Sequence, residues 1–399
     1  MNTMKRMILA VAAVMLLMPL LTGLAEVTEE RTEERGRVTS IIWKDENGNP
    51  AAGPDGYAEI RYTYDYQQVT EVYYDAEGYP YATEGGYCGK RTTLDSRNML
   101  SSIEYLDAYG KLTMTRMGYA MISYSHYTSG AERLVVFHGA DQRPCIVPSL
   151  GYAQVEDEYS GYTLVGRKFM NETGGLVDTQ AGYAAMKKKM NKSRQIIRVW
   201  YEHADETPAT GPDGWSYCVT DRDNNGRAVE VRYYDIHDNL TDLGGCARET
   251  YTYDREGRAT MTRYDAQDNA IGFGGDAVSV RRKTKNDKVL EETYLNADGE
   301  PTELPEGYAT AAYSYNAADQ LELIQYYNAA GNKQACKYGY AAISQIWDVT
   351  GQLLSKIYLD ENGQPVNNVS GVNKEQFVYD SEGRLKDTKK FDIDGNPVR

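Results

Sequence analysis

The chain has 399 residues, 41% of them hydrophobic and 25% charged, a balance that is typical of a folded protein and argues against a disordered one. Its formal net charge of −15 argues against binding to nucleic acid or to anionic membranes, which would repel it. Tyrosine is the outlier, with 35 Tyr against 5 Phe and 4 Trp, and favours thin sheets wetted on one side over a thick aliphatic core.

The first 25 residues are typical of a secretory signal peptide. Lys5 and Arg6 supply the positive start, and Met7–Leu21 form an apolar run of fifteen residues. Residues 23–25, Gly-Leu-Ala, then offer small side chains at a cleavage site. A membrane anchor is the alternative, but the run contains Pro19 and is shorter than the about 20 residues that span a bilayer. No later stretch is apolar enough to cross a membrane, so we expect a secreted, extracellular protein that is released or held at the cell surface.

Residues 26–38 form a short charged segment, after which a single repeat fills the chain from Thr39 to Arg399. Its first mark is a Gly that is usually followed by an aromatic and a small residue. The recurrence of this Gly within one chain indicates a backbone position that needs a positive φ or that another group approaches closely. Eleven such glycines span 315 residues, a mean spacing of 31.5, at Gly56, Gly86, Gly118, Gly151, Gly182, Gly214, Gly245, Gly275, Gly307, Gly339 and Gly371.

A second recurring residue, which we call the second mark, has the same spacing. An aromatic residue stands two positions before a turn, and from Tyr73 to Tyr233 it returns every 32 residues, five times in succession. The two marks together predict about eleven units of about 32 residues, each packed mainly on its neighbours. The full set of the second mark is Trp43, Tyr73, Tyr105, Phe137, Phe169, Tyr201, Tyr233, Tyr294, Tyr326 and Tyr358.

Each unit has the pattern of one β-hairpin and a loop. From Ala58 to Tyr64, apolar and polar residues alternate as they do on a half-buried strand, and Val69–Tyr74 form a second strand. Turns of the form Asp-x-x-Gly, at residues 254–257, 348–351 and 380–383, have type I turn chemistry. No helix is required. We therefore predict an all-β fold of tandem β-hairpins that forms an elongated solenoid or a spiral sheet.

The repeat weakens in two places. Residues 182–232 keep the spacing but lose apolar character, and Ser279, Arg281 and Lys283 are expected on the inner face of the eighth unit. A charged inner face is compatible with a weak unit, with a bend or with an interior that is not dry, and the sequence leaves these three open.

Two segments carry the motif of a known family. Tyr251–Arg258 and Phe377–Leu385 resemble the YD repeat of bacterial RHS-type proteins, whose core is Tyr-x-Tyr-Asp-x-x-Gly-Arg-Leu. The resemblance implies an extracellular or surface protein whose hairpins wind into a spiral sheet, in some members a shell around a toxin. It also implies contact with carbohydrate or with cell surfaces. This chain has a longer period, and we find no toxin domain or processing motif in it, so we expect fold and location to carry over more than function.

No pattern of reactive side chains predicts catalysis. Cys218 and Cys246 are the one pair of cysteines in neighbouring units, and the alternation points their side chains apart, so we expect free thiols. Phosphate loops, zincin motifs and Cys-x-x-Cys are missing from the sequence. We expect no enzymatic activity and no catalytic residue. The four histidines stand beside no nucleophile motif and share no repeat position: His126, His138, His203 and His237.

Calcium is the one cofactor that the sequence leaves open. Asp221–Gly226 fits the first half of a calcium loop, and Asp392–Gly395 echoes it. Arg232, however, stands where the loop would need a bidentate Glu. Asp, Asn and Gly are also the ordinary residues of tight turns, so we predict no metal site.

The aromatic residues beside the loops are the candidate binding residues. A regular row of such rings could stack on sugar rings, which predicts a non-catalytic secreted protein that binds glycan or a cell-surface polymer. The alternative is that the rings pack between hairpins, which predicts a purely structural spacer or a shell fragment of an RHS-like system. A solvent-open row of rings would favour binding, and rings stacked inside would favour the spacer. The residues are Tyr57, Tyr87, Tyr119, Tyr152, Tyr183, Trp215, Tyr308 and Tyr340.

Overall fold

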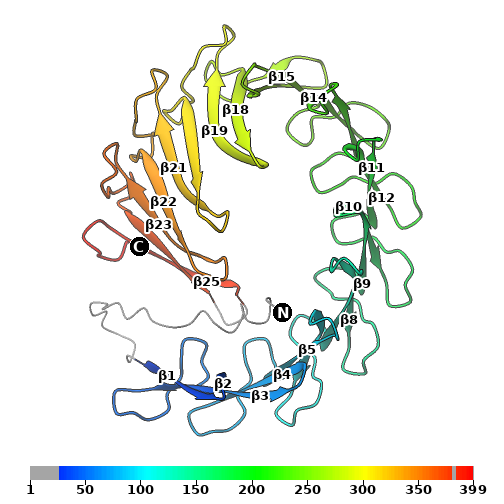
Figure 1. Cartoon of the computed structure of the whole chain (residues 1–399), viewed down its shortest axis with the longest axis vertical. Coiled ribbons are helices and arrows are strands. Elements are labelled where there is room, and N and C mark those ends of the chain that lie inside the picture. The colour runs from blue at the N-terminus through cyan, green and yellow to red at the C-terminus, as the bar shows by residue number, and fades with distance from the viewer. Residues whose placement is uncertain (1–26, 380–382, 399) are drawn as a thin grey trace. The chain divides into compact units, whose positions relative to one another are not determined.

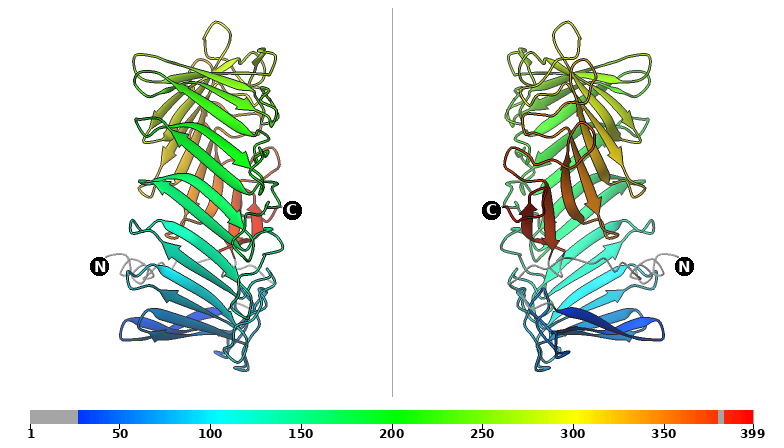
Figure 2. Two further views of the ribbon diagram at one scale, coloured as in Figure 1. Left: turned by 90° about the vertical axis from the view of Figure 1, so that its right-hand side faces the viewer. Right: turned by 90° about the vertical axis from the view of Figure 1, so that its left-hand side faces the viewer.

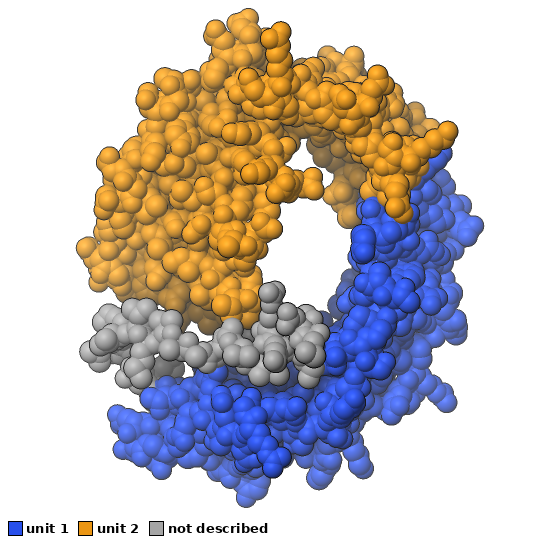
Figure 3. Space-filling model, in the orientation of Figure 1, with its two compact units in different colours: residues 1–189, 200–211 blue, residues 190–199, 212–399 orange. Residues whose placement is uncertain are grey.

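The computed structural model describes residues 27–379 and 383–398. The predicted signal peptide, residues 1–25, lies outside these residues, and so do the first three residues of the predicted turn at 380–383. Within the described residues the fold is all-β, as predicted, with 25 strands and no helix, hence no helix that could cross a membrane (Figure 1). The chain divides into two compact units, residues 1–189 with 200–211 and residues 190–199 with 212–399 (Figure 3).

In unit 1, successive strands lie side by side and pair antiparallel in chain order (Figure 2). Each pair of strands is a hairpin, and the loop that follows leads to the next one, which confirms the predicted repeating unit. The strands are β1 (Thr28–Glu34), β2 (Arg37–Lys44), β3 (Glu59–Asp65), β4 (Gln68–Tyr74), β5 (Gly89–Leu94), β6 (Leu100–Leu106), β7 (Met121–His126), β8 (Glu132–His138), β9 (Gln154–Ser160) and β10 (Thr163–Met170).

Unit 2 repeats the same arrangement, and β11 (Ala185–Met190) and β12 (Ile196–Glu202) contain residues of both units. Its other strands are β13 (Tyr217–Arg222), β14 (Ala228–Tyr234), β15 (Arg248–Tyr253), β16 (Ala259–Tyr264), β17 (Ala270–Ile271), β18 (Ser279–Lys285), β19 (Lys288–Leu295), β20 (Thr310–Tyr315), β21 (Leu321–Tyr327), β22 (Ala342–Trp347), β23 (Leu353–Leu359), β24 (Lys374–Tyr379) and β25 (Leu385–Phe391).

The array begins earlier than the predicted boundary at Thr39. Strand β1 lies inside the segment 26–38 and pairs with β2 across a two-residue turn, Arg35-Gly36, in which both φ angles are positive (52° and 75°). Seven polar residues in a row, Thr28–Glu34, carry no apolar alternation, and every one of them is exposed. The backbone pairing alone makes this strand, so periodicity could not reveal it.

The Asp-x-x-Gly turns form as predicted where the structure describes them. In the first, Oδ1 of Asp254 accepts the backbone N–H groups of Glu256 (3.0 Å) and Arg258 (2.9 Å), and Gly257 has φ 79°. Asp348 does the same in its own turn. The Asp therefore satisfies two backbone donors that the turn leaves without strand partners, which is why Asp or Asn recurs at this position.

The tyrosine that precedes Asp in the YD-like motif binds the neighbouring hairpin. Tyr253 donates its hydroxyl to the carbonyl of Ala228 (2.7 Å), and Tyr315 donates to Val289 (3.0 Å). Trp347 uses its indole Nε1 in the same way, on the carbonyl of Leu321 (2.7 Å). These hydrogen bonds join residues 25 or 26 positions apart, so the motif residue connects its own repeat unit to the preceding repeat unit.

The residues predicted for the inner face of the eighth unit were wrong, because the strand is shifted by one position. Val280 pairs with Tyr294 and is fully buried, and Arg282 pairs with Glu292, whereas Arg281 lies on the opposite face. The cause is the preceding loop: Val278 donates to Leu295 the backbone bond that Ala58 donates to Tyr74 in the second hairpin, which shifts the strand by one position. A slip of one residue exchanges the two faces of a strand.

Candidate functional site

The candidate binding rings of unit 1 belong to one continuous stack, which we call the aromatic ladder. Rings of the Gly mark alternate in it with rings of the second mark, and neighbouring centroids are 4.7 to 6.1 Å apart. The contacts are edge-to-face or tilted, the arrangements that aromatic quadrupoles favour. In order, the rings are Trp43, Tyr57, Tyr73, Tyr87, Tyr105, Tyr119, Phe137, Tyr152, Phe169, Tyr183 and Tyr201.

Unit 2 has the same ladder with a polar interruption. Trp215 contacts Tyr233 at 5.8 Å, and a run of five further contacts joins Phe273, Tyr294, Tyr308, Tyr326, Tyr340 and Tyr358 at 4.6 to 6.2 Å. The positions between the two runs are occupied by Cys246 and Arg263. The Arg263 guanidinium lies 4.0 Å from the centre of the Phe273 ring, so a cation–π contact takes the place of a ring pair there.

The eight candidate binding residues lie within these stacks. Tyr57, Tyr87, Tyr119 and Trp215 are buried, with 2%, 3%, 7% and 9% of their surface exposed. Tyr152, Tyr183, Tyr308 and Tyr340 are half-buried. Burial raises the pKa of Tyr152, because a partly dehydrated environment disfavours the charged form of its hydroxyl. The rings therefore form no solvent-open row, and the geometry favours the alternative of packing between hairpins.

The loop glycines make room for the ladder. Gly56 ends its turn at φ 90°, a conformation that L side chains rarely adopt. Gly53, three residues earlier, has ordinary φ, but a Cβ there would lie 2.6 Å from Cδ2 of the Trp43 ring. The loop backbone thus covers the ring edge directly, which explains why glycine recurs in these loops.

Two carboxylates on the ladder side of the sheet are paired with arginines. Asp157, itself buried, receives two hydrogen bonds from Arg167 (2.6 and 2.7 Å), and this bond raises the pKa of the Arg167 guanidinium. In unit 2, Glu292 accepts from Arg282 (2.7 Å) and from the Tyr313 hydroxyl (2.8 Å). Bidentate and doubly satisfied carboxylates of this kind are structural bonds between strands. At these two positions the charge on the inner face is thus neutralised within the sheet.

The reactive side chains singled out in the sequence are scattered or engaged. All five cysteines are free, as predicted, and burial raises the pKa of the Cys246 thiol to about 11, which makes it a poor nucleophile. In the calcium-like segment, Asp221 binds Arg232 (2.6 Å) and Asp223 binds Arg227 (2.7 Å). Across residues 27–379 and 383–398, no group of three or more His, Cys, Asp or Glu side chains is arranged to hold a metal.

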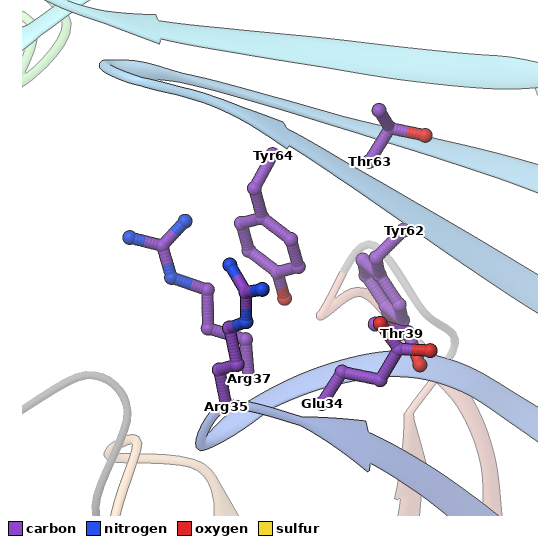
Figure 4. Close-up of a pocket in the computed structure, with 7 residues that line it drawn as sticks. All are labelled: Glu34, Arg35, Arg37, Thr39, Tyr62, Thr63 and Tyr64. Atoms are coloured by element: carbon purple, nitrogen blue, oxygen red, sulfur yellow. The ribbon is translucent and has the colours of Figure 1, made fainter.

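A pocket that the sequence did not reveal lies on unit 1, beside the tips of the first two hairpins (Figure 4). Its volume is about 720 Å³. The Arg37 guanidinium lies 5.1 Å from the centre of the Tyr64 ring, and Glu34 lies on the side of Tyr62 (Figure 4). The lining residues are Glu34, Arg35, Arg37, Thr39, Tyr62, Thr63 and Tyr64. No motif marks such a site, because Arg35 lies in the first turn, Arg37 begins β2, and the tyrosines come from the next hairpin.

No protein-family model and no curated protein matches this chain. Among solved structures, it is similar to the crystal structure of TcdB2-TccC3-TEV, with 10% sequence identity and a TM-score of 0.28, over 93% of this chain and 22% of that one. It is also similar to the Photorhabdus luminescens Tc holotoxin pore with a TccC3 mutation, with 11% identity, the same TM-score and the same coverage. The chain thus spans 22% of the length of these chains. The resemblance to YD repeats continues to rest on its motif residues.

Proposed function

We propose that this protein is a non-catalytic structural array, a spacer or scaffold of stacked β-hairpins in an RHS-like system, and that it is exported. The observation that carries the proposal is the packing of the loop-side rings within the aromatic ladder, where four of the eight are buried and four are half-buried. Each of these rings has other ladder rings as its packing partners, so a sugar could stack on one only after the core of that unit had opened. The cost of opening argues against glycan binding through this row.

The bonds between neighbouring hairpins support the same role. Tyrosine hydroxyls such as that of Tyr253 reach the carbonyls of the preceding hairpin. Glutamine side chains at hairpin turns do the same in the other direction, as Gln195 does by donating to the Gly226 carbonyl (2.8 Å). Units that are bonded in this way resist separation, which a spacer requires and a flexible binder does not.

Two substitutions in the mature chain test the proposal. Tyr57→Ala removes a buried ladder ring, and Tyr66→Ala removes a ring that is 89% exposed at the tip of the β3–β4 hairpin. Thermal unfolding and retention on purified cell wall and on a glycan panel are measured for both variants and for the unaltered chain. We expect Tyr57→Ala to lower the melting temperature, Tyr66→Ala to leave it unchanged, and none of the three proteins to be retained.

The opposite pattern would support the glycan hypothesis. If the unaltered chain is retained on a glycan, and Tyr57→Ala abolishes that retention while the melting temperature stays the same, the ring is a binding residue and the structural proposal is wrong. Retention that is lost only in Tyr66→Ala would move binding to the hairpin tips and would leave the ladder structural.

A further inference from the structure

The geometry of the pocket beside the first two hairpins points to a binding site for a small organic anion, a ligand with a carboxylate or phosphate group attached to a flat ring. This site is separate from the aromatic ladder and does not depend on the structural role proposed above. Its volume of about 720 Å³ lies within the range of small-molecule sites, about 300 to 1,000 Å³.

The two arginines of the pocket have no carboxylate partner. Within the described residues, no carboxylate oxygen lies within 4.0 Å of the Arg35 or Arg37 guanidinium, whereas Arg61 on the neighbouring strand pairs with Glu59 at 2.7 Å. Glu34 precedes Arg35 in the sequence and pairs with Arg37 in the backbone register of the hairpin, but its carboxylate makes no ion pair within 4.0 Å with either guanidinium. Two guanidinium groups directed at one cavity match the geometry of a carboxylate or a phosphate.

The backbone at Arg35 places its side chain at the pocket, although a positive φ is not specific to this turn, since ten other non-glycine residues of the described chain also have one. Arg35 is the first residue of a two-residue hairpin turn and has φ 52°, in the left-handed region. Turns of this type strongly favour Asn, Asp or Gly at that position, and Arg gains nothing there from the backbone. The turn thus contributes one of the two guanidinium groups that line the pocket.

The remaining residues orient the ligand. Tyr64 is fixed by its hydrogen bond to the Val38 carbonyl (2.8 Å) and presents its ring beside Arg37. Glu34 lies toward Tyr62 and repels an anion from that part of the cavity (Figure 4). The charged group of the ligand therefore lies between Arg35 and Arg37, and its ring lies against the tyrosines, with the hydroxyl of Thr39 in reach of polar substituents.

Four small probes test the ligand class on the full mature chain, by titration followed with calorimetry and NMR. Benzoate and phenyl phosphate carry the two anions on a ring, benzamide has the shape of benzoate without the charge, and acetate has the charge without the ring. We expect saturable binding of benzoate or phenyl phosphate, weaker binding of acetate and none of benzamide. The tighter of the first two identifies the anion. Equal binding of benzoate and benzamide, or no saturable binding of either anion, would overturn the inference.

Matched variants locate the binding. Arg35→Gly removes one guanidinium and suits the positive φ, so we expect it to fold at least as stably and to bind about tenfold more weakly. Glu34→Gln removes the repulsive charge and should strengthen binding. Arg194→Gly is the control, because Arg194 also stands in a hairpin turn with positive φ (62°) but does not line the pocket. If Arg35→Gly and Arg194→Gly bind alike, the arginine pocket is not the site.

Discussion

Replacement of Tyr87 by Ala tests how much the aromatic ladder stabilises unit 1. The Tyr87 side chain is 3% exposed and contacts Tyr73 and Tyr105 at centroid distances of 6.1 and 4.8 Å. Truncation of a buried aromatic ring costs about 3 to 5 kcal/mol. About 0.5 to 1.5 kcal/mol of this comes from each ring pair that is lost. Tyr87→Phe keeps both ring pairs, and the hydroxyl makes no side-chain hydrogen bond within the described residues, so we expect a change below about 0.5 kcal/mol.

The assay is urea unfolding followed by circular dichroism, with hydrogen exchange of the β5 and β6 amides as a local measure. A repeat array need not unfold in two states, so the free energies are fitted with a nearest-neighbour scheme. Tyr109→Ala is the control, because Tyr109 is 88% exposed and its truncation should cost no more than about 0.5 kcal/mol. If Tyr87→Ala costs less than about 1 kcal/mol, or no more than Tyr109→Ala, the ladder is not the core and our reasoning is refuted.

Three further outcomes follow from individual contacts within the array. Tyr253→Phe removes the hydroxyl that binds the Ala228 carbonyl (2.7 Å) and should lower the free energy of unfolding by about 1 kcal/mol; no change in urea unfolding would contradict the role of the motif tyrosine. The backbone N–H of Asn239 lowers the pKa of Asp235, so the stability from this turn is complete above the ordinary pKa of 3.8 and is lost as the pH falls through the lowered folded value. Asp235→Asn should therefore lose less stability than the unaltered chain between pH 7 and pH 2, as measured by urea midpoints, and equal loss would argue against this turn as a source of acid sensitivity. Gly211→Ala places a Cβ in steric conflict with the Tyr201 ring and should destabilise the fold by about 1 to 3 kcal/mol in thermal unfolding, a cost that an unchanged melting temperature would exclude.

The repeat and its hairpin unit could be predicted from the sequence because both depend on local rules. The alternation after Gly56 and the Asp-x-x-Gly turns each define a short stretch of backbone. Because the repeat has a period of about 32 residues, the same local pattern predicts the same structure in each unit. The free state of the five cysteines followed from the same frame. Local rules failed where the chain departs from the pattern. Thr28–Glu34 forms a strand although it has no apolar alternation. A shift of one residue in the loop before Val278 exchanges the two faces of β18.

The candidate site could be predicted only in part. The sequence places an aromatic residue after each marker Gly but does not tell which way its ring turns, so the row of Tyr57 and its equivalents was compatible with an open groove or a core. The ring stack is decided by contacts between units, such as that of Tyr57 with Tyr73 at 4.9 Å. The pocket of Arg35 and Tyr64 has no sequence signal, because it depends on the first turn and the second hairpin lying next to each other.

Chemical modification of tyrosine tests the central claim most directly. Tetranitromethane is applied to the folded protein for increasing times, and the rate at each tyrosine is read by peptide mass spectrometry. We expect Tyr66, Tyr109 and Tyr162, which are 89%, 88% and 92% exposed, to react quickly, and Tyr57, Tyr87 and Tyr119 to react only after denaturant unfolds the chain. Reaction of the second group at the rate of the first, in the folded protein, would show an open row of rings and would contradict the ladder as the core.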